Sequence, residues 1–306
     1  MKHQLTYFCI LILTLACNVS VPQPALVPDS VSETAPSLEV VPAAQTPEFG
    51  PISTYTLLYI SGTMHIESKS DSWPRDVDAF LAFLEATISA GMRWSIGADV
   101  GWLEGGERVA EIIERAGAMG VQWDVHTHEP ADRAKAAYLL DQYGVTPTSV
   151  VSGLRIEEFD GLLQPLVYQG YAWTPQVVWG GVLCVGHRPG CDDTSIALYR
   201  PMSSAEYALH NPNGALIRVG NTDHQLSTLD ELLLQVAGHD FSDVPVLSFT
   251  VMVEPETLQI VNSEDGLTEL LAFVERVHLN PSVRFGTIEE AAFAWEAAGS
   301  VPIQIP

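Results

Sequence analysis

Short apolar segments alternate with amphipathic segments between residues 53 and 298, and this alternation restricts the folds open to the chain. Segments with the length and composition of strands lie at 54–60, 92–96, 120–125, 149–151, 171–173, 215–219, 246–253 and 283–285. Helices with an apolar face are expected from Pro74 onwards and at 107–119, 130–143, 159–168, 229–236, 267–277 and 288–298. About seven or eight strand–helix units predict an α/β fold, a (β/α) barrel that is complete or slightly irregular. The alternative is an open doubly wound sheet.

Residues 175–212 interrupt this alternation. The segment is rich in Gly, Pro and aromatic residues, and long irregular insertions of this kind are often lids or binding loops. No clear glycine-rich nucleotide fingerprint follows a strand, because the run 97–101 matches that motif poorly. We therefore expect the insertion to shape a binding site, and we expect no dinucleotide.

Polar side chains follow the ends of the expected strands rather than their starts. In a parallel barrel the active site lies at these carboxyl ends, so the one-sided distribution indicates a site there. The candidates are His65, Glu67, His126, His128, Glu129, Asp223, His224, Glu254 and, within the insertion, Asp192 and Asp193. Each also has a structural interpretation, as a helix cap, a turn residue or a solvated charge.

His126 and His128 are the most informative pair. Residues two apart on a strand point to the same side, so the two imidazoles can aim at one point. His65 and Glu67 have the same spacing and share a face if the first strand extends that far. Imidazole is a ligand for zinc and related ions, so we predict a divalent metal, zinc first, with His65, His126 and His128 as candidate ligands.

The first residues predict the compartment. An apolar run at 5–16 follows a short charged start and is too short to span a bilayer. It ends in Ala16-Cys17 and resembles a bacterial lipoprotein signal, with Thr14 a mild departure. The resemblance implies a signal peptide at 1–16, lipidation of Cys17 and, because Asn18 is not Asp, the outer membrane. The alternatives are an ordinary secretory signal, an uncleaved anchor, or a cytosolic protein with an apolar start.

A tether and a single domain are expected after the signal. Residues 17–52 are dominated by Pro, Ser, Ala, Val and Glu, a composition that predicts a flexible tether. Residues 53–298 are long enough for one barrel domain, and 299–306 form a C-terminal tail. In an oxidising compartment Cys184 and Cys191 are expected to form a disulfide, with a Cys/His metal site that includes His187 as the alternative.

The net charge of −24 limits the partners. Nucleic acid is disfavoured, because its backbone must be neutralised by Lys and Arg, and so is adhesion to anionic lipid surfaces. We therefore expect any membrane contact to be made through the lipid anchor alone.

The order of elements resembles the polysaccharide deacetylase family, carbohydrate esterase family four. In that family a helix ends in a Gly, a short strand follows, and a His-Ser/Thr-x-x-His motif supplies two metal ligands. Gly120 and His126-Thr127 match this pattern, whereas the second His position is Pro130 and the nearest substitute is His128. The family's Thr-Phe-Asp-Asp-Gly motif is replaced by the run 63–67, which has no Asp pair.

The resemblance implies a metal-dependent hydrolase that removes N-acetyl or other acyl groups from envelope or extracellular carbohydrate. With the strand-end residues it gives a mechanistic hypothesis: His126, His128 and either His65 or Glu67 hold the ion. Glu67 or Glu129 accepts a proton and His224 or Asp223 returns one. Trp173 and Trp179 either stack on sugar or belong to the core. Two alternatives stay open: a catalytically inactive carbohydrate-binding lipoprotein on the same fold, and a metal-dependent hydrolase of another class.

Overall fold

The computed structural model describes residues 56–68, 72–181, 195–222, 224–238 and 243–305. Several predictions fall on residues outside these ranges and stay predictions. They concern the signal peptide and tether, Cys17, Asp192, Asp193, Asp223, and the pair Cys184 and Cys191.

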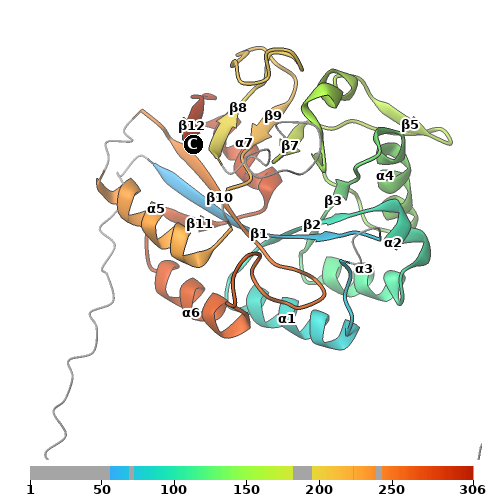
Figure 1. The fold of residues 1–306 in the computed structure, drawn as a ribbon, viewed down its shortest axis with the longest axis horizontal. Helices are drawn as coiled ribbons and strands as arrows, with labels where there is room; N and C mark the ends of the chain where they lie inside the picture. Colours follow the sequence, from blue (N-terminus) through green and yellow to red (C-terminus); the bar gives the residue numbers. More distant parts are fainter. Residues whose placement is uncertain (1–55, 69–71, 182–194, 223, 239–242, 306) are drawn as a thin grey trace, which may run out of the picture. The chain divides into compact units, whose positions relative to one another are not determined.

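A ten-stranded sheet forms the centre of the domain, in the order β10-β1-β2-β3-β4-β7-β9-β8-β12, with β11 also paired to β1 (Figure 1). The strands are β1 Leu57–Ile66, β2 Trp94–Ala98, β3 Gln122–His126, β4 Val150–Ser152, β7 Val177–Trp179, β8 Ile196–Tyr199, β9 Ile217–Val219, β10 Val246–Met252, β11 Val283–Phe285 and β12 Ile303–Ile305. Pairing is parallel from β10 to β9, whereas β8 and β12 run antiparallel to their neighbours.

β10, at one end of the sheet, lies close to β8, which is the last strand but one at the other end. The loop after β9 bridges the gap. Thr250 on β10 donates its N–H to Thr222 Oγ1 over 3.1 Å and its hydroxyl to the carbonyl of Asn221 over 2.5 Å. These bonds make the sheet a nearly closed barrel, and the prediction of an irregular (β/α) barrel is confirmed.

Helices cover the outer side of the sheet (Figure 1). They are α1 Val77–Ser89, α2 Val100–Gly105, α3 Val109–Ala118, α4 Arg133–Gln142, α5 Leu226–Gly238, α6 Leu267–Val277 and α7 Ile288–Ala297, with 3-10 helices η1 Pro130–Asp132 and η2 Ile156–Leu162. α1 begins where the side chain of Asp76 accepts the N–H groups of Asp78 and Ala79, both at 3.0 Å. Its buried face is apolar, as the helical period predicts.

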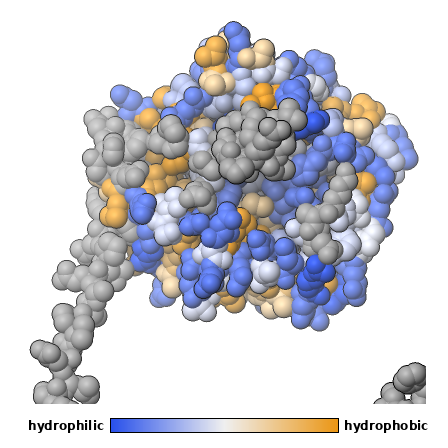
Figure 2. Space-filling view, in the orientation of Figure 1, coloured by the Kyte–Doolittle hydropathy of each residue, from blue (hydrophilic) through white to orange (hydrophobic). Residues whose placement is uncertain are grey.

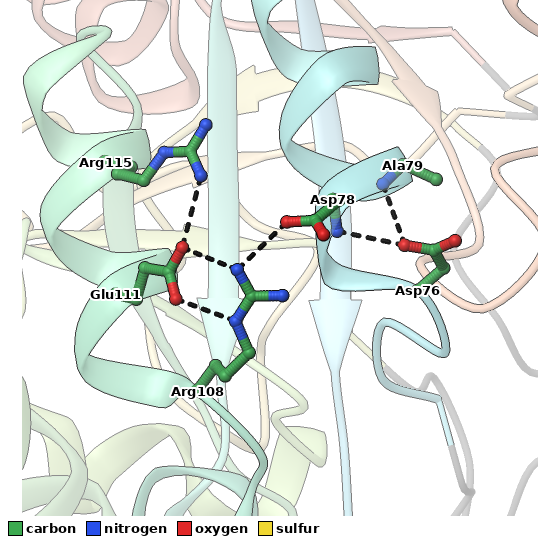
Figure 3. Close-up of polar contacts among 6 residues, drawn as sticks. All are labelled: Asp76, Asp78, Ala79, Arg108, Glu111 and Arg115. Carbon is green, nitrogen blue, oxygen red and sulfur yellow. Dashed lines mark hydrogen bonds and ion pairs between the residues drawn. The ribbon is translucent and has the colours of Figure 1, made fainter.

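A charged network joins the start of α3 to α1 (Figure 3). Arg108, whose φ is 52°, contacts Asp78 at 2.9 Å and Glu111 at 2.6 Å, and Arg115 lies 3.2 Å from Glu111. Such exposed pairs contribute little to stability. Figure 2 shows hydrophilic and hydrophobic residues interspersed on the visible face.

Polar residues lie on the interior-facing side of β1 and β3. His65 and Gly97 are register partners on β1 and β2, and the strand period of two places Thr63 on the same side as His65. Asp124 likewise shares the side of His126, and Thr63 and Asp124 are both buried. These polar residues of β1 and β3 therefore lie on the inner side of the sheet, whereas on β7 and β9 the same side carries the register partners Trp179 and Val219.

The structure corrects three expectations. Residues 171–173 are not a barrel strand, because β6 Tyr171–Trp173 pairs with β5 Leu166–Tyr168 in a separate two-stranded sheet. The helix expected at 159–168 ends with η2, and Pro165 and β5 follow. The next barrel strand is instead β7, within the segment expected to be irregular, where Val177 and Val178 are fully buried.

Both ends of the predicted domain also differ. β1 extends to Ile66, so His65 lies within the strand rather than after it. Residues 303–305, expected to be a tail, form β12 and pair with β8. No helix in the described part of the chain combines the length and apolar character needed to cross a membrane.

Candidate functional site

Two histidines meet across Gly97. β2 separates β1 from β3, and a Cβ at Gly97 would lie 2.7 Å from the Cβ of His126 and 3.2 Å from Cδ2 of His65. Because Gly97 has no side chain, the two imidazoles stack with their centroids 3.7 Å apart and their planes at 27°. Three adjacent parallel strands thus bring together residues that are far apart in the sequence.

Glu67 follows β1 directly and contacts three imidazoles. Its Oε1 lies 2.9 Å from His126 Nε2 and 3.9 Å from His65 Nδ1, and its Oε2 lies 3.4 Å from His128 Nε2. His128 is the most exposed of these side chains, at 36%, and His126 the least, at 2%. The cluster is therefore buried on one side and open to solvent at His128.

The electrostatics favour an ionised Glu67 among neutral imidazoles. Burial lowers the pKa of His65 well below its usual value, and His126 lowers it further. Burial also lowers the pKa of His126, although the hydrogen bond and the negative charge of Glu67 raise it in part. Burial disfavours the charged form of Glu67, yet hydrogen bonding by His126 and His128 holds the pKa of this carboxyl far below its ordinary range. These protonation states are the ones in which carboxylate and imidazole bind a cation.

Ser152 and Gly153 lie against the ring of His126. His126 and Ser152 are register partners on β3 and β4, and Ser152 Oγ lies 2.8 Å from His126 Nδ1. Gly153 follows with a φ of +75°, and a Cβ there would lie 3.1 Å from Cε1 of His126. An outer hydrogen bond of this kind fixes the tautomer and orientation of a ligating imidazole.

Asp99 anchors the turn that carries Glu67. Its Oδ2 accepts the N–H and the hydroxyl of Ser68, at 2.9 and 2.8 Å, while its Oδ1 accepts the N–H of Trp102 at 2.7 Å and caps α2. Asp99 and Ser152 were missed by the sequence reasoning. Asp99 follows β2 directly and Ser152 ends β4. A polar residue at the carboxyl end of a strand is the sequence signal that could have identified both.

His65, Glu67 and His126 fit a metal ion. One ligand atom from each lies within 4.8 Å of the others. Two ligand atoms that each lie about 2.1 Å from a tetrahedral ion are about 3.4 Å from each other. Glu67 Oε1 lies 2.9 Å from His126 Nε2 and 3.9 Å from His65 Nδ1, so the observed distances bracket this value. His65 Nε2 is buried and has no hydrogen-bond partner in the described part of the chain. The donor set suits zinc and similar divalent ions.

Trp179 and His224 lie beside this cluster. The Trp179 ring is 5.0 Å from that of His65 and 6.1 Å from that of His224. His224 is buried, has a φ of 65°, and places Nδ1 3.4 Å from the carbonyl of Thr250. A non-glycine residue in this conformation is uncommon, and such conformations concentrate at functional sites. Asp223, the alternative candidate for returning a proton, lies outside the described residues.

Three other candidates lie elsewhere. Glu129 is exposed at the start of η1 and is not part of the metal-binding group. Glu254 accepts a hydrogen bond from Thr257 within the turn after β10, at 3.1 Å. Trp173 is buried and donates its ring N–H to the carbonyl of Thr148, at 2.8 Å, which favours a core role over sugar stacking.

The molecule is thus an irregular (β/α) barrel with an imidazole–carboxylate cluster at the carboxyl ends of its strands. No family model matches the chain, and no curated protein matches it.

The solved structures that are similar in fold include three at 12% identity each. The first, a candidate polysaccharide deacetylase from Mycobacterium smegmatis, has a TM-score of 0.48 and aligns over 85% of this chain and 98% of its own. A candidate glycoside hydrolase/deacetylase from Parabacteroides distasonis has a TM-score of 0.47, over 81% and 73%. A 4-alpha-glucanotransferase from Thermococcus litoralis has a TM-score of 0.46, over 81% and 41%. The activity of this chain is therefore inferred from the geometry of its own site.

Proposed function

We propose that this protein is a metal-dependent hydrolase that removes acyl groups from carbohydrate. The observation that carries the proposal is the convergence of His65, Glu67 and His126 over Gly97. The sequence resemblance to polysaccharide deacetylases supports the choice of an acylated sugar as substrate.

His65, Glu67 and His126 would hold the ion, and zinc suits this donor set best. A divalent ion in such a site activates water and polarises a carbonyl group. Ser152 keeps the His126 ring in place, and Asp99 keeps the turn of Glu67 in place, so outer hydrogen bonds position both ligands.

The remaining histidines would move protons. His128 is next to Glu67 and reaches solvent, which suits a group that exchanges protons with water. The contact between His224 Nδ1 and the carbonyl of Thr250 places the proton of a neutral His224 on Nδ1, because a carbonyl only accepts. We assign His224 the delivery of a proton to the leaving group: its Nε2 would first take up the proton that the attacking water releases, and transfer of that proton to the leaving group would return His224 to its neutral form.

The proposed location follows from the sequence. A lipid on Cys17 and a tether at 17–52 would hold the barrel close to a bacterial outer membrane, where acylated envelope or extracellular polymers are available. The shortage of Lys and Arg, 14 against 38 Asp and Glu, disfavours a polyphosphate substrate, because few cations are available to bind phosphate.

Replacement of His126 by Ala is expected to abolish both zinc binding and hydrolysis. Wild-type protein, dialysed after exposure to zinc, should retain about one ion per chain, because three ligands bind it. The variant should retain almost none, while His278→Ala, a change at the end of α6, should behave as wild type. Elemental analysis and release of acetate from an N-acetylated oligosaccharide measure the two effects. Equal zinc content in both variants would refute the proposed ligand set.

A non-catalytic function has one specific observation in its favour. Glu67 is the one carboxylate of the metal-binding group found among the described residues, so its use as a ligand leaves the group without a carboxylate base. A zinc-independent sugar-binding protein would bind oligosaccharide without releasing acetate. Hydrolysis assays with a panel of acylated sugars and phosphoesters distinguish the three functions. Release of acetate indicates the proposed function, hydrolysis of a phosphoester indicates another hydrolase class, and binding without hydrolysis indicates a sugar-binding protein.

A further inference from the structure

Trp179 occupies a position that its predicted role in sugar stacking does not explain. It ends β7, and its ring stands edge-on to His65, with planes at 83°. Its plane is tilted by 40° from that of His224. Only 2% of the residue is exposed, so no open ring face is available to a sugar. The indole instead lies beside His65, a proposed metal ligand, and His224, the proposed proton donor.

The ring N–H of Trp179 has no acceptor within the described residues. An indole N–H can only donate, and a buried donor without a partner costs free energy. Other buried indoles of this chain do find acceptors. Trp94 donates to Thr87 Oγ1, Trp173 to the carbonyl of Thr148 and Trp295 to the carbonyl of Val301.

One further buried indole lacks an acceptor, but it does not bear on this site. Trp123 is adjacent to Asp124 on β3, so the strand period turns it away from the side of Asp124 and His126. Its ring stacks on that of Trp102 in α2, with planes at 18°. Trp179 is therefore the unpartnered indole that lies against the cluster.

A second unpartnered atom lies in the neighbouring ring. His65 Nε2 also lacks a hydrogen-bond partner among the described residues, whereas Nδ1 of the same ring is the atom near Glu67. Two adjacent buried rings thus leave polar atoms without partners, and only an acceptor can satisfy Trp179. The oxygen of a carbonyl or a carboxylate has this property.

We propose that the ring N–H of Trp179 donates a hydrogen bond to an oxygen of the bound acyl group. This inference rests on the proposed function and adds to it a residue that binds the reacting group. A fixed donor at this position stabilises the negative charge that develops on the acyl oxygen during hydrolysis. The carboxylate product keeps the same oxygen, so acetate is a direct probe of the contact.

The experiment uses full-length zinc-loaded protein with ¹⁵N-labelled tryptophan. The chain has seven Trp, and single Trp→Phe variants assign their indole resonances. Titration with sodium acetate should shift the Trp179 indole proton downfield in a saturable manner. Trp179→Phe, which keeps an aromatic ring but removes the donor, should bind acetate at least about 10-fold more weakly.

Trp173→Phe is the matched control. It also removes a buried indole donor, but one that is bonded to Thr148, so acetate affinity should not change. For the acylated substrate, Trp179→Phe should lower kcat by roughly 100-fold or more with little change in KM, as expected for a donor that acts mainly on the developing charge.

Three results would overturn the inference: no acetate binding, a Trp179 resonance that stays fixed at saturating acetate, or equal acetate affinity of Trp179→Phe and wild type. The resonance shift is measured on wild-type protein, so this part of the test can be carried out even if Trp179→Phe does not fold. A protein that binds zinc and hydrolyses substrate but shows no effect at Trp179 refutes this inference alone. A protein whose Trp179 responds to acetate but which binds no zinc refutes the proposed function alone.

Discussion

Replacement of Glu67 by Gln is expected to weaken zinc binding by at least about 100-fold, because loss of an outer-shell partner alone typically costs 10–100-fold. Glu67 supplies the negative charge of the cluster and approaches His65, His126 and His128 with its two oxygens. Gln has nearly the same shape, so the barrel should remain folded, but a neutral amide offsets none of the charge of the ion. Calorimetric titration of metal-free protein with zinc measures the loss.

Glu254→Gln is the control for this change. Glu254 also follows a strand of the barrel, but its carboxylate accepts a hydrogen bond from Thr257 instead of contacting the histidines. Zinc should raise the thermal unfolding temperature of the wild type and of Glu254→Gln, because a ligand that binds only the folded state stabilises it. Zinc should have almost no such effect on Glu67→Gln. An unchanged affinity in Glu67→Gln would remove Glu67 from the ligand set.

Replacement of Asp124 by Asn is expected to stabilise the protein increasingly as the pH rises from about 4 to about 8. Burial raises the pKa of Asp124 to about 8, although the hydrogen bond from Thr148 Oγ1 lowers it in part. The unfolded chain releases this proton near the ordinary value of 3.8. Between these two values the folded state binds the extra proton, so the free energy of unfolding falls as the pH rises through this range. Above about pH 8 the contribution is constant.

Asn has the shape of the neutral acid and carries no titrating proton. The difference in the free energy of unfolding between Asp124→Asn and wild type should therefore increase by about 2–5 kcal/mol between pH 4.5 and pH 8.5. Urea titrations at the two pH values measure it. Asp141→Asn, an exposed change on α4, should show no such increase. A difference that does not vary with pH would show that Asp124 is ionised in the folded protein throughout this range.

The residues of the cluster could be predicted from the sequence because the members of each pair are two apart, but the predicted ligand set differs in one member: His128 follows β3 and lies outside the metal-binding group of His65, Glu67 and His126. His126 and His128 are two apart, and so are His65 and Glu67, and each pair lies at the carboxyl end of an apolar segment. The barrel was accessible for a similar reason, since the periods of strands and helices alternate along most of the domain. These features are local, and local patterns can be read without knowledge of the fold.

The supporting residues were not accessible because their roles depend on register between strands. Gly97 matters because β2 pairs it with His65 and places it under His126, and Ser152 matters because β4 pairs it with His126. Spacing along the chain does not give these pairings. β7 is a strand of three residues in a Gly- and Pro-rich segment, and β12 joins the sheet through antiparallel pairing with β8, so neither carries a strong local signal.

The most direct test is a crystal structure of the full chain grown with zinc, with diffraction data collected on both sides of the zinc absorption edge. Our account predicts one anomalous peak about 2.0–2.2 Å from a nitrogen of His65, an oxygen of Glu67 and a nitrogen of His126. Density at saturating zinc that lies only at other residues, or that leaves this cluster empty, would contradict the central claim.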